Sequence, residues 1–312
     1  MAVTNGAIAA PPPVRSGRMR TALRGRGGAV PTLPLVGPSV VLLLLWSLVP
    51  LAMTLWFSFR RYNLLNPIIH GFAGWNNYRF LFQDPALVSS LIVTVILVAA
   101  VLAITVGLGA VLAAVFETGF PGRGIARVLM ISPFFVMPTV SALIWKNLLM
   151  NPVNGLFAWI LRGVGLPAFD WFATAPLASI IMIVSWEWLP FAFLILMTSL
   201  QSLDEEIIEA ARLDGAGSVA MFRYIQVPHL GRSISVVVMV ETIFLLGIFA
   251  EIYVTTAGGP GVATTNLAFL IYQRALLAFN VGSASAAGVI AIVLANIVAI
   301  FLINTVAKRL DV

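Results

Sequence analysis

Six long apolar stretches constrain this chain more than any other feature of its sequence. A helix needs roughly 20 apolar residues to cross about 30 Å of hydrocarbon. Stretches of this kind lie near residues 33–58, 88–116, 125–149, 173–200, 234–256 and 282–306. Only helices and closed barrels satisfy every backbone polar group in lipid, and these runs are too long for barrel strands. The sequence therefore predicts an all-α membrane protein with six transmembrane helices.

The composition excludes a soluble protein. Of the 312 residues, 60% are hydrophobic and only 10% are charged, whereas soluble domains carry about 25% charged residues. The chain has too little polar surface to cover a globule in water. The absence of cysteine excludes disulfides, thiolate metal sites and cysteine nucleophiles. We interpret the net charge of +6 as a signal of membrane orientation, and not as a nucleic-acid surface.

The distribution of basic residues predicts the orientation. A cytoplasmic N-terminus places twice as many of the 18 basic residues inside as outside, which is the expected bias. We therefore expect both termini in the cytoplasm. Residues 1–31 are predicted to be a disordered basic cytoplasmic tail. Residues 32–87 would form the first transmembrane helix and an external loop, residues 88–306 a five-helix core, and residues 307–312 a cytoplasmic C-terminus.

Small residues and prolines suggest where the spans pack and bend. Helices in lipid approach one another most closely at small side chains. We therefore expect the stripe of Ala99, Ala103 and Gly107 in the second span to contact another helix. Pro133 and Pro138 should distort the third span, because proline lacks a backbone N–H.

The segment 202–228, between the fourth and fifth spans, is the one long polar loop that faces the cytoplasm in this orientation. Ser202 and Glu205 have the spacing of a capping box, which predicts the start of a short helix. Apolar residues at helical spacing give that helix one apolar face: Leu203, Ile207, Ile208 and Ala211.

The same loop predicts a second short helix. Gly215 and Gly217 should end the first helix. The second helix, over about 218–226, should stop before Pro228. The result would be a pair of amphipathic helices joined by a glycine turn.

The charge of the first helix suggests what it contacts. An interfacial helix pair resting on lipid headgroups is one alternative, but such helices are usually basic. Here five acids accompany a single basic residue, Arg212: Asp204, Glu205, Glu206, Glu209 and Asp214. This pattern favours docking to a protein.

The residues of this loop carry a resemblance to a known family. Glu209-Ala210-Ala211, then Asp214-Gly215-Ala216, Ile225 and Val227-Pro228, resembles the EAA motif of binding-protein-dependent ABC importer permeases, with Val227 in place of leucine. The resemblance covers roughly 88–305 and implies the type I ABC importer permease fold. It also implies that short cytoplasmic coupling helices dock to an ATPase through these residues: Glu209, Ala210, Ala211, Asp214, Gly215, Ile225 and Pro228.

The resemblance also implies partners and a location. The chain would be a multi-pass subunit in a bacterial inner membrane, where it would pair with a second homologous permease as a heterodimer. Two cytoplasmic ATPase subunits and an extracytoplasmic solute-binding protein would complete the transporter. The chain contains no G-x-x-x-x-G-K-[ST] phosphate loop. We therefore expect ATP and Mg on the partner ATPase, no cofactor or metal on this chain, and no enzymatic activity of its own.

Further motifs indicate the substrate class. Pro133 to Pro138 with Trp145, followed by Asn151-Pro152 and Asn154-Gly155, resembles sugar permeases related to the maltose system. The segment 249–260 ends in Ala-Gly-Gly-Pro and is similar to their external loop. General similarity around Asn266 and residues 279–286 is greatest to sorbitol and mannitol permeases. We therefore expect an importer of a carbohydrate, either a sugar alcohol or a sugar.

Three acidic residues fall within predicted spans. Glu187 lies in the fourth span between Trp186 and Trp188. A carboxylate beside aromatic faces suits a polyhydroxyl ligand, but a neutral Glu187 bonded to a neighbouring helix is the alternative. Glu241 and Glu251 lie in the fifth span, about 15 Å apart along the helix, so they cannot face one point. Charges in spans usually face a bundle interior or a cavity. We therefore regard the three acids, and the tryptophans that flank Glu187, as candidates for the substrate pathway.

Two other functions compete with the importer. A proton-coupled secondary transporter would also use buried carboxylates, but it would not need the acidic loop with EAA spacing. A membrane-embedded enzyme is disfavoured because the two histidines, His70 and His229, should lie on opposite sides of the membrane. We expect His229 to be a solvated loop residue.

Overall fold

The structure is a computed structural model that describes residues 32–66, 68 and 71–310. The predicted tail 1–31, the last two residues of the predicted C-terminus and His70 lie outside the described residues. The chain divides into two compact units, Met1–Ala52 and Met53–Val312. Helix α1 (Thr32–Ser58) begins in the first unit, and all other elements belong to the second.

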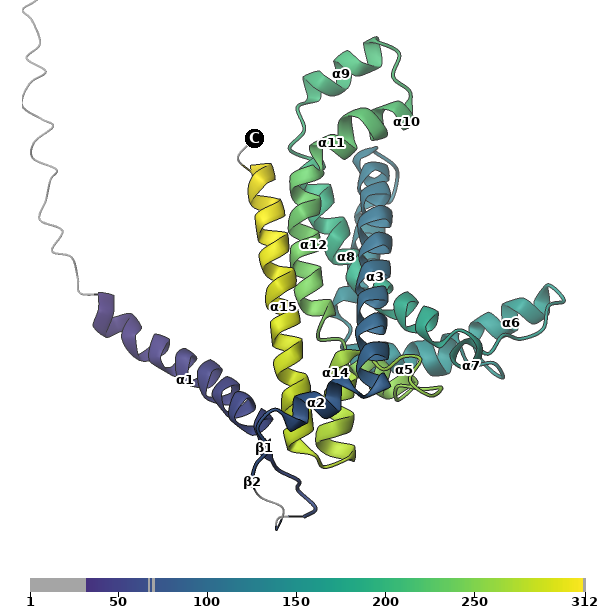
Figure 1. The fold of residues 1–312 in the computed structure, drawn as a ribbon. Coiled ribbons are helices and arrows are strands. Elements are labelled where there is room, and N and C mark those ends of the chain that lie inside the picture. The colour runs from purple at the N-terminus through teal and green to yellow at the C-terminus, as the bar shows by residue number, and fades with distance from the viewer. Residues whose placement is uncertain (1–31, 67, 69–70, 311–312) are drawn as a thin grey trace, which may run out of the picture. The chain divides into compact units, whose positions relative to one another are not determined.

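The second unit is almost entirely helical. Its short elements before the core are β1 (Arg60–Arg61), β2 (Gly71–Phe72) and α2 (Asn76–Phe82). The core elements follow: α3 (Pro85–Glu117), α4 (Arg123–Ile131), η1 (Ser132–Phe135), α5 (Pro138–Ile144), η2 (Trp145–Leu149), α6 (Leu156–Gly163), α7 (Trp171–Thr174) and α8 (Pro176–Leu200). The remainder comprises α9 (Glu205–Leu213), α10 (Ser218–Met221), η3 (Phe222–Gln226), α11 (Val227–His229), α12 (Gly231–Leu245), α13 (Ala250–Thr255), α14 (Leu267–Tyr272), η4 (Gln273–Leu277) and α15 (Val281–Leu310). Figure 1 shows α9 and α10 at one end of this unit, and α2 and α14 near the other.

The described residues include four helices that are long and apolar enough to cross a membrane, or up to six spans if each bent pair counts as one. The first bent pair is Arg123–Phe135 with Pro138–Leu149, at an angle of 107°. Pro138 opens α5, after extended backbone at Met137. The predicted distortion of the third span is therefore a sharp break at this proline.

The predicted fifth span, 234–256, is wrong as a continuous helix. Helix α12 ends at Leu245, and α13 begins only at Ala250. The break needs partners for its backbone groups, because lipid offers none. The amide nitrogen of Asn266 donates to the carbonyl of Ile248, 2.5 Å away, while Asn266 Oδ1 caps α14 by accepting from the N–H of Phe269 at 2.8 Å.

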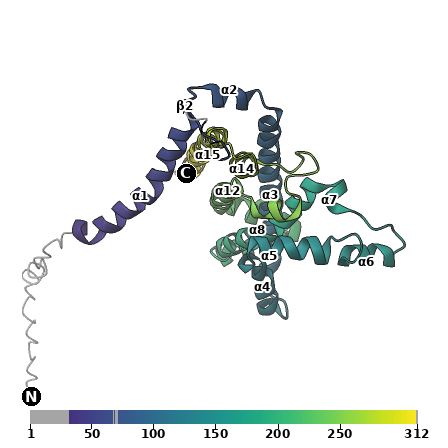
Figure 2. The same ribbon diagram turned by 90° about the horizontal axis from the view of Figure 1, so that it is seen from below.

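The core of the unit lies where α3 packs along α8. A Cβ placed on Gly109 would lie 3.1 Å from Cβ of Ala192 and 3.3 Å from the Phe193 nitrogen, so the two backbones come close there. The predicted stripe of Ala99, Ala103 and Gly107 is exposed on this chain, so its contact with another helix stays a prediction. Seen from below, α12 lies among α3, α8 and α15, and α6 extends to one side (Figure 2).

A polar network joins the elements near α2. The strands β1 and β2 pair antiparallel, with Arg60 opposite Phe72. The amide nitrogen of Asn77 donates to the carbonyls of Ser58 (2.8 Å) and Arg60 (2.9 Å). Asp84 caps α3 by accepting from the N–H of Ala86 at 2.9 Å, and it forms an ion pair with Arg274.

Candidate functional site

Helix α9 is a short acidic helix that stands apart from the bundle. It buries none of its residues, and Leu213 is 90% exposed. The predicted capping box does not form. Ser202 instead donates its hydroxyl to the carbonyl of Ser199 at 2.7 Å, and Asp204 is the N-cap without a side-chain cap. Glu205 and Glu206 still place negative charge in the first turn, where the helix dipole favours it.

The turn after α9 is built on Gly215, as the sequence predicts. Gly215 has a φ of +82°, which glycine adopts without strain. Its N–H donates to the carbonyl of Arg212 at 3.1 Å, and the N–H of Ala216 donates to the carbonyl of Ala211 at 2.9 Å. These two bonds form a Schellman motif. A helix closed in this way keeps its end fixed, so α9 can move as a rigid element.

The segment after the turn leads directly into the bundle. The predicted stop before Pro228 is wrong, because helix continues through α11 and then bends by 64° into α12. Pro228 directly follows the π-helical turn η3, in which the N–H of Val227 donates to the carbonyl of Phe222. The expected solvated role of His229 is also wrong, since its Nε2 lies 3.0 Å from the carbonyl of Ser199 at the end of α8. Movement of this segment is therefore tied to both α8 and α12.

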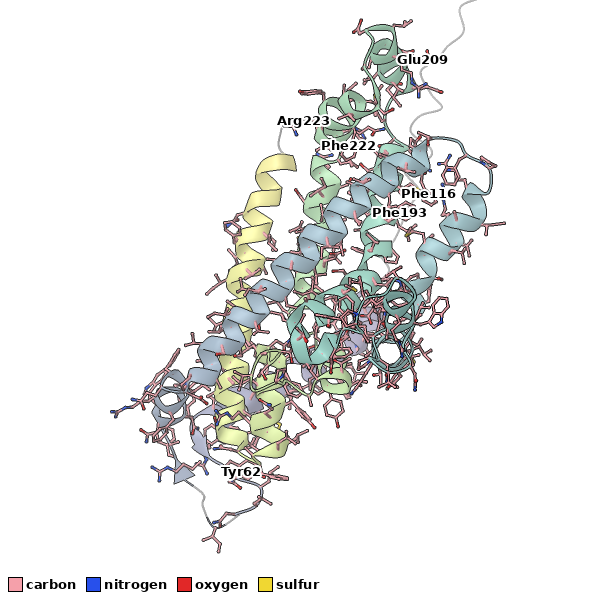
Figure 3. All side chains as sticks on the ribbon, turned by 90° about the vertical axis from the view of Figure 1, so that its right-hand side faces the viewer. Tyr62, Phe116, Phe193, Glu209, Phe222 and Arg223 are labelled. Atoms are coloured by element: carbon pink, nitrogen blue, oxygen red, sulfur yellow. The ribbon has the colours of Figure 1, made fainter. Side chains whose placement is uncertain are left out.

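The structure brings the predicted coupling residues together at one end of the unit. Glu209, Ala210, Asp214, Gly215 and Pro228 are exposed, while Ala211 and Ile225 are half-buried. Figure 3 shows Glu209 on α9, beyond the labelled core residues Phe116 and Phe193. The exposed acids of α9 give this end of the unit a negatively charged surface.

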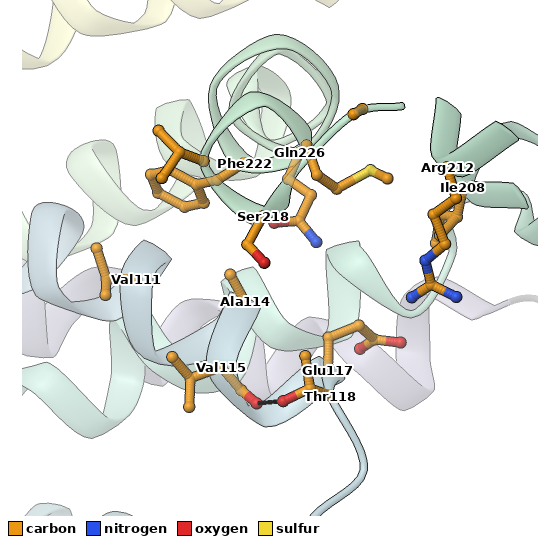
Figure 4. Close-up of a pocket in the computed structure, with 13 residues that line it drawn as sticks. Val111, Ala114, Val115, Glu117, Thr118, Ile208, Arg212, Ser218, Phe222 and Gln226 are labelled. Atoms are coloured by element: carbon orange, nitrogen blue, oxygen red, sulfur yellow. Dashed lines mark hydrogen bonds between the residues drawn. The ribbon is translucent and has the colours of Figure 1, made fainter. Parts of the chain in front are cut away.

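A pocket of about 550 Å³ separates α9 and α10 from the end of α3. Its walls carry apolar side chains, among them Val115, Ile208 and Phe222. Two opposite charges also line it, Glu117 at the end of α3 and Arg212 on α9. Figure 4 shows these two side chains extending into the same space from different elements.

The acid Glu241 joins two helices inside the bundle. It is 0% exposed, and its Oε2 accepts a hydrogen bond of 2.7 Å from the hydroxyl of Thr105 on α3. Its Oε1 has no hydrogen-bond partner among the described residues. The Thr105 hydroxyl is therefore the donor that the described part of the chain supplies to this buried carboxyl.

We predict that Thr105→Val destabilises the protein while Thr105→Ser does not. Valine keeps the shape of threonine but removes the donor, and an unsatisfied buried polar group costs roughly 1–3 kcal/mol. Thermal unfolding of the purified protein in detergent, followed by tryptophan fluorescence, measures the effect. Equal melting temperatures for the two variants would show that the bond contributes nothing.

The other two acids meet each other. Glu187, 6% exposed, and Glu251, 2% exposed, lie side by side, with Ser141 beside Glu187. They therefore lie where α8, α13 and α5 meet, while Glu187 Oε1 and Ser141 Oγ have no hydrogen-bond partner among the described residues. The flanking tryptophans turn away: Trp186 packs on Trp145 at 5.8 Å, and Trp188 packs on Phe244 at 5.3 Å. The two rings point in different directions because successive helix residues are about 100° apart. Solute contact by these residues stays a prediction.

An exposed aromatic platform, which sequence analysis missed, follows the break in the fifth span. Phe249 stacks on Tyr253 with ring centres 5.5 Å apart. Tyr272 closes the group, at 5.0 Å from Phe249 and 5.4 Å from Tyr253. Tyr253 is 50% exposed. The rings come from the N-cap of α13, from α13 itself and from α14, so no local pattern in the sequence reveals the whole platform.

Comparison with known proteins identifies relatives over most of the chain. Residues 105–312 match the family described as "Binding-protein-dependent transport system inner membrane component". The probable ABC transporter permease protein y4oQ of Sinorhizobium fredii is 32% identical over 251 residues, covering 80% of this chain and 81% of that protein. The trehalose/maltose transport system permease protein MalF of Thermococcus litoralis is 31% identical over 79% of this chain and 84% of its own. The sn-glycerol-3-phosphate transport system permease protein UgpA of Agrobacterium fabrum is 28% identical, with 88% and 94% covered.

Solved structures show the same fold. A bacterial ABC transporter involved in the import of the acidic polysaccharide alginate superimposes with a TM-score of 0.75. The match covers 88% of this chain and 94% of that one, at 19% identity. The alginate transporter in complex with an alginate pentasaccharide-bound periplasmic protein gives 0.74. The arrangement of helices in this chain is therefore that of a type I importer permease.

Proposed function

The chain belongs to the family of binding-protein-dependent transport system inner membrane components, and we propose that it forms one half of a carbohydrate pathway in an ABC importer. As a permease subunit of the inner membrane it is not an enzyme. A second, homologous permease would supply the other half. A solute-binding protein outside the membrane would deliver solute, as the alginate transporter complex suggests.

The protruding acidic helix α9 is the observation that carries the proposal. A rigid, capped helix outside the bundle has no packing role in its own chain, yet its continuation enters the membrane domain through α11 and α12. We assign it to a cleft of a separate ATPase subunit, one of two beneath the permeases. Closure of the ATPase pair would then move α9 and tilt the bundle by rigid-body gating, and hydrolysis would reset it.

For the solute, we propose a carbohydrate or sugar alcohol, with a hexitol of the sorbitol or mannitol type as the specific candidate. The names of the relatives support this class, since they refer to trehalose, maltose and sn-glycerol-3-phosphate. A pathway between two permeases must be lined by residues that one chain leaves exposed. Tyr253 meets this condition, and aromatic rings pack well on the C–H faces of polyols. The buried residues Glu187, Glu241 and Glu251 would not contact the solute. They would hold in place the helices that line the pathway.

Purification of the tagged chain from mild detergent tests the assembly. We expect mass spectrometry to find a second permease and an ATPase, and the complex to hydrolyse ATP faster with its solute and binding protein. The rates of ATP hydrolysis are then compared in the presence of hexitols, hexoses, disaccharides and glycerol-3-phosphate. A preparation without an ATPase that moves solute down a proton gradient in liposomes would overturn the proposal in favour of a secondary transporter.

We predict that Tyr253→Ala weakens solute-dependent stimulation roughly tenfold in apparent affinity, because removal of the ring deletes a stacking surface worth about 1 kcal/mol or more. Tyr253→Phe keeps the ring and should retain most of the affinity. The measurement is the solute concentration that gives half-maximal ATP hydrolysis. An unchanged value for the alanine variant would remove Tyr253 from the pathway.

A further inference from the structure

The end of α3 holds an acid in an unfavourable place. Glu117 is the last residue of α3, where the negative end of the helix dipole disfavours a carboxylate. Its Oε2 is buried and has no hydrogen-bond partner among the described residues. The last turn of α3 contains no basic residue. The carboxylate therefore lacks a compensating positive charge on its own helix.

A positive charge faces Glu117 across the pocket. Arg212 is the single basic residue of α9, and it extends into the pocket from the opposite wall (Figure 4). Both residues lie in the described part of the chain, and no ion pair joins them there. The space between them is large enough for α9 to move inward, and the apolar Ile208 and Val115 line the same walls.

We infer that this pocket closes during the transport cycle, and that Arg212 then pairs with Glu117. The pair gives α9 a direct attachment to α3, besides the continuous chain through α11 into α12. Closure also brings Ile208 of α9 against the exposed Val115 of α3, which removes apolar surface from water. Glu117 thereby becomes the positioning residue through which displacement of α9 reaches the helix that packs along α8. The inference rests on the proposed docking of α9 to an ATPase.

Charge reversal tests the pair in the complete transporter. Glu117→Arg and Arg212→Glu should each lower solute-stimulated ATP hydrolysis by up to roughly fivefold, the upper range for a partly exposed ion pair. The double variant Glu117→Arg with Arg212→Glu should recover most of the wild-type rate. Glu117→Arg combined with Arg223→Glu is the matched control, because Arg223 is exposed on η3 and does not line the pocket; it should recover nothing. Failure of the first double variant to recover would overturn the pair.

Closure itself has a separate readout, because the chain contains no cysteine. Ala114→Cys places one thiol on the pocket wall, and Thr198→Cys places one at an exposed site on α8 outside the pocket. Maleimide should label both in the nucleotide-free complex. ATP with vanadate should slow labelling at position 114 severalfold and leave position 198 unchanged. Equal labelling of position 114 in both states would overturn closure, whereas a wild-type complex without any ATPase would instead refute the proposed function.

Discussion

Glu209→Lys abolishes solute-stimulated ATP hydrolysis and uptake, with at least a tenfold loss, if α9 docks to the ATPase as proposed. Glu209 is exposed on a helix that buries none of its own residues, so the substitution leaves the fold intact. It replaces an acid with a base on a surface that is otherwise acidic. Like charges brought together at an interface cost several kcal/mol. The measurement is uptake and ATPase rate in proteoliposomes, with the amount of membrane-inserted chain determined by immunoblot.

Two controls separate docking from a general effect of charge. Glu209→Gln removes the charge without reversing it, and it should retain more activity than the lysine variant. Thr198→Lys adds a positive charge at an exposed site near the end of α8, and it should leave both rates near wild type. Normal uptake by Glu209→Lys would refute the assignment of α9 as a coupling helix. A matching loss in Thr198→Lys would point to surface charge in place of a specific contact.

The sequence predicted an all-helical membrane fold because long apolar runs have few physical interpretations; six spans are reached only if each of two bent helix pairs counts as one span. It did not predict which face of each helix packs. The lipid-facing side and the packed side of a membrane helix are both apolar, so hydropathy does not distinguish them. The stripe of Ala99, Ala103 and Gly107 is therefore exposed on this chain, while Gly109 two residues further makes the close approach to α8. The sequence alone cannot tell whether Gly107 or Gly109 faces α8, because that depends on where α8 lies.

The breaks in the helices show a second limit. Proline marked the break before Pro138, because its missing N–H has a local effect. The break after Leu245 has no such marker. It is satisfied by Asn266, 18 residues beyond Ile248 in sequence, and such a partner is visible only after folding. The coupling segment also contains one feature that local sequence predicts and one that depends on the folded structure. The Gly215 turn follows from local chemistry, whereas His229 lies 3.0 Å from the carbonyl of Ser199, 30 residues earlier, because folding places the end of α8 beside it.

Gly155→Ala destabilises the protein by about 3 kcal/mol, the upper end of the usual cost of forcing atoms into a filled site. Gly155 precedes α6 with an ordinary φ of −73°, so the reason is space and not backbone conformation. A Cβ at this position would lie 2.5 Å from the carbonyl oxygen of Asn151, 2.6 Å from its nitrogen and 2.7 Å from the carbonyl oxygen of Leu149. All three are backbone atoms, which cannot rotate away.

The turn that approaches Gly155 is itself fixed, which is why relaxation does not relieve the clash. Asn151 accepts through its side chain from the N–H groups of Val153 at 2.9 Å and Asn154 at 3.1 Å. Gly163→Ala, on the last residue of α6, is the matched control, because a Cβ there meets nothing within 4 Å. It should keep or slightly raise the melting temperature, since alanine favours helix over glycine. Thermal unfolding in detergent distinguishes the two variants, and an equal effect at both positions would show that the loop yields and that glycine at 155 is not required by packing.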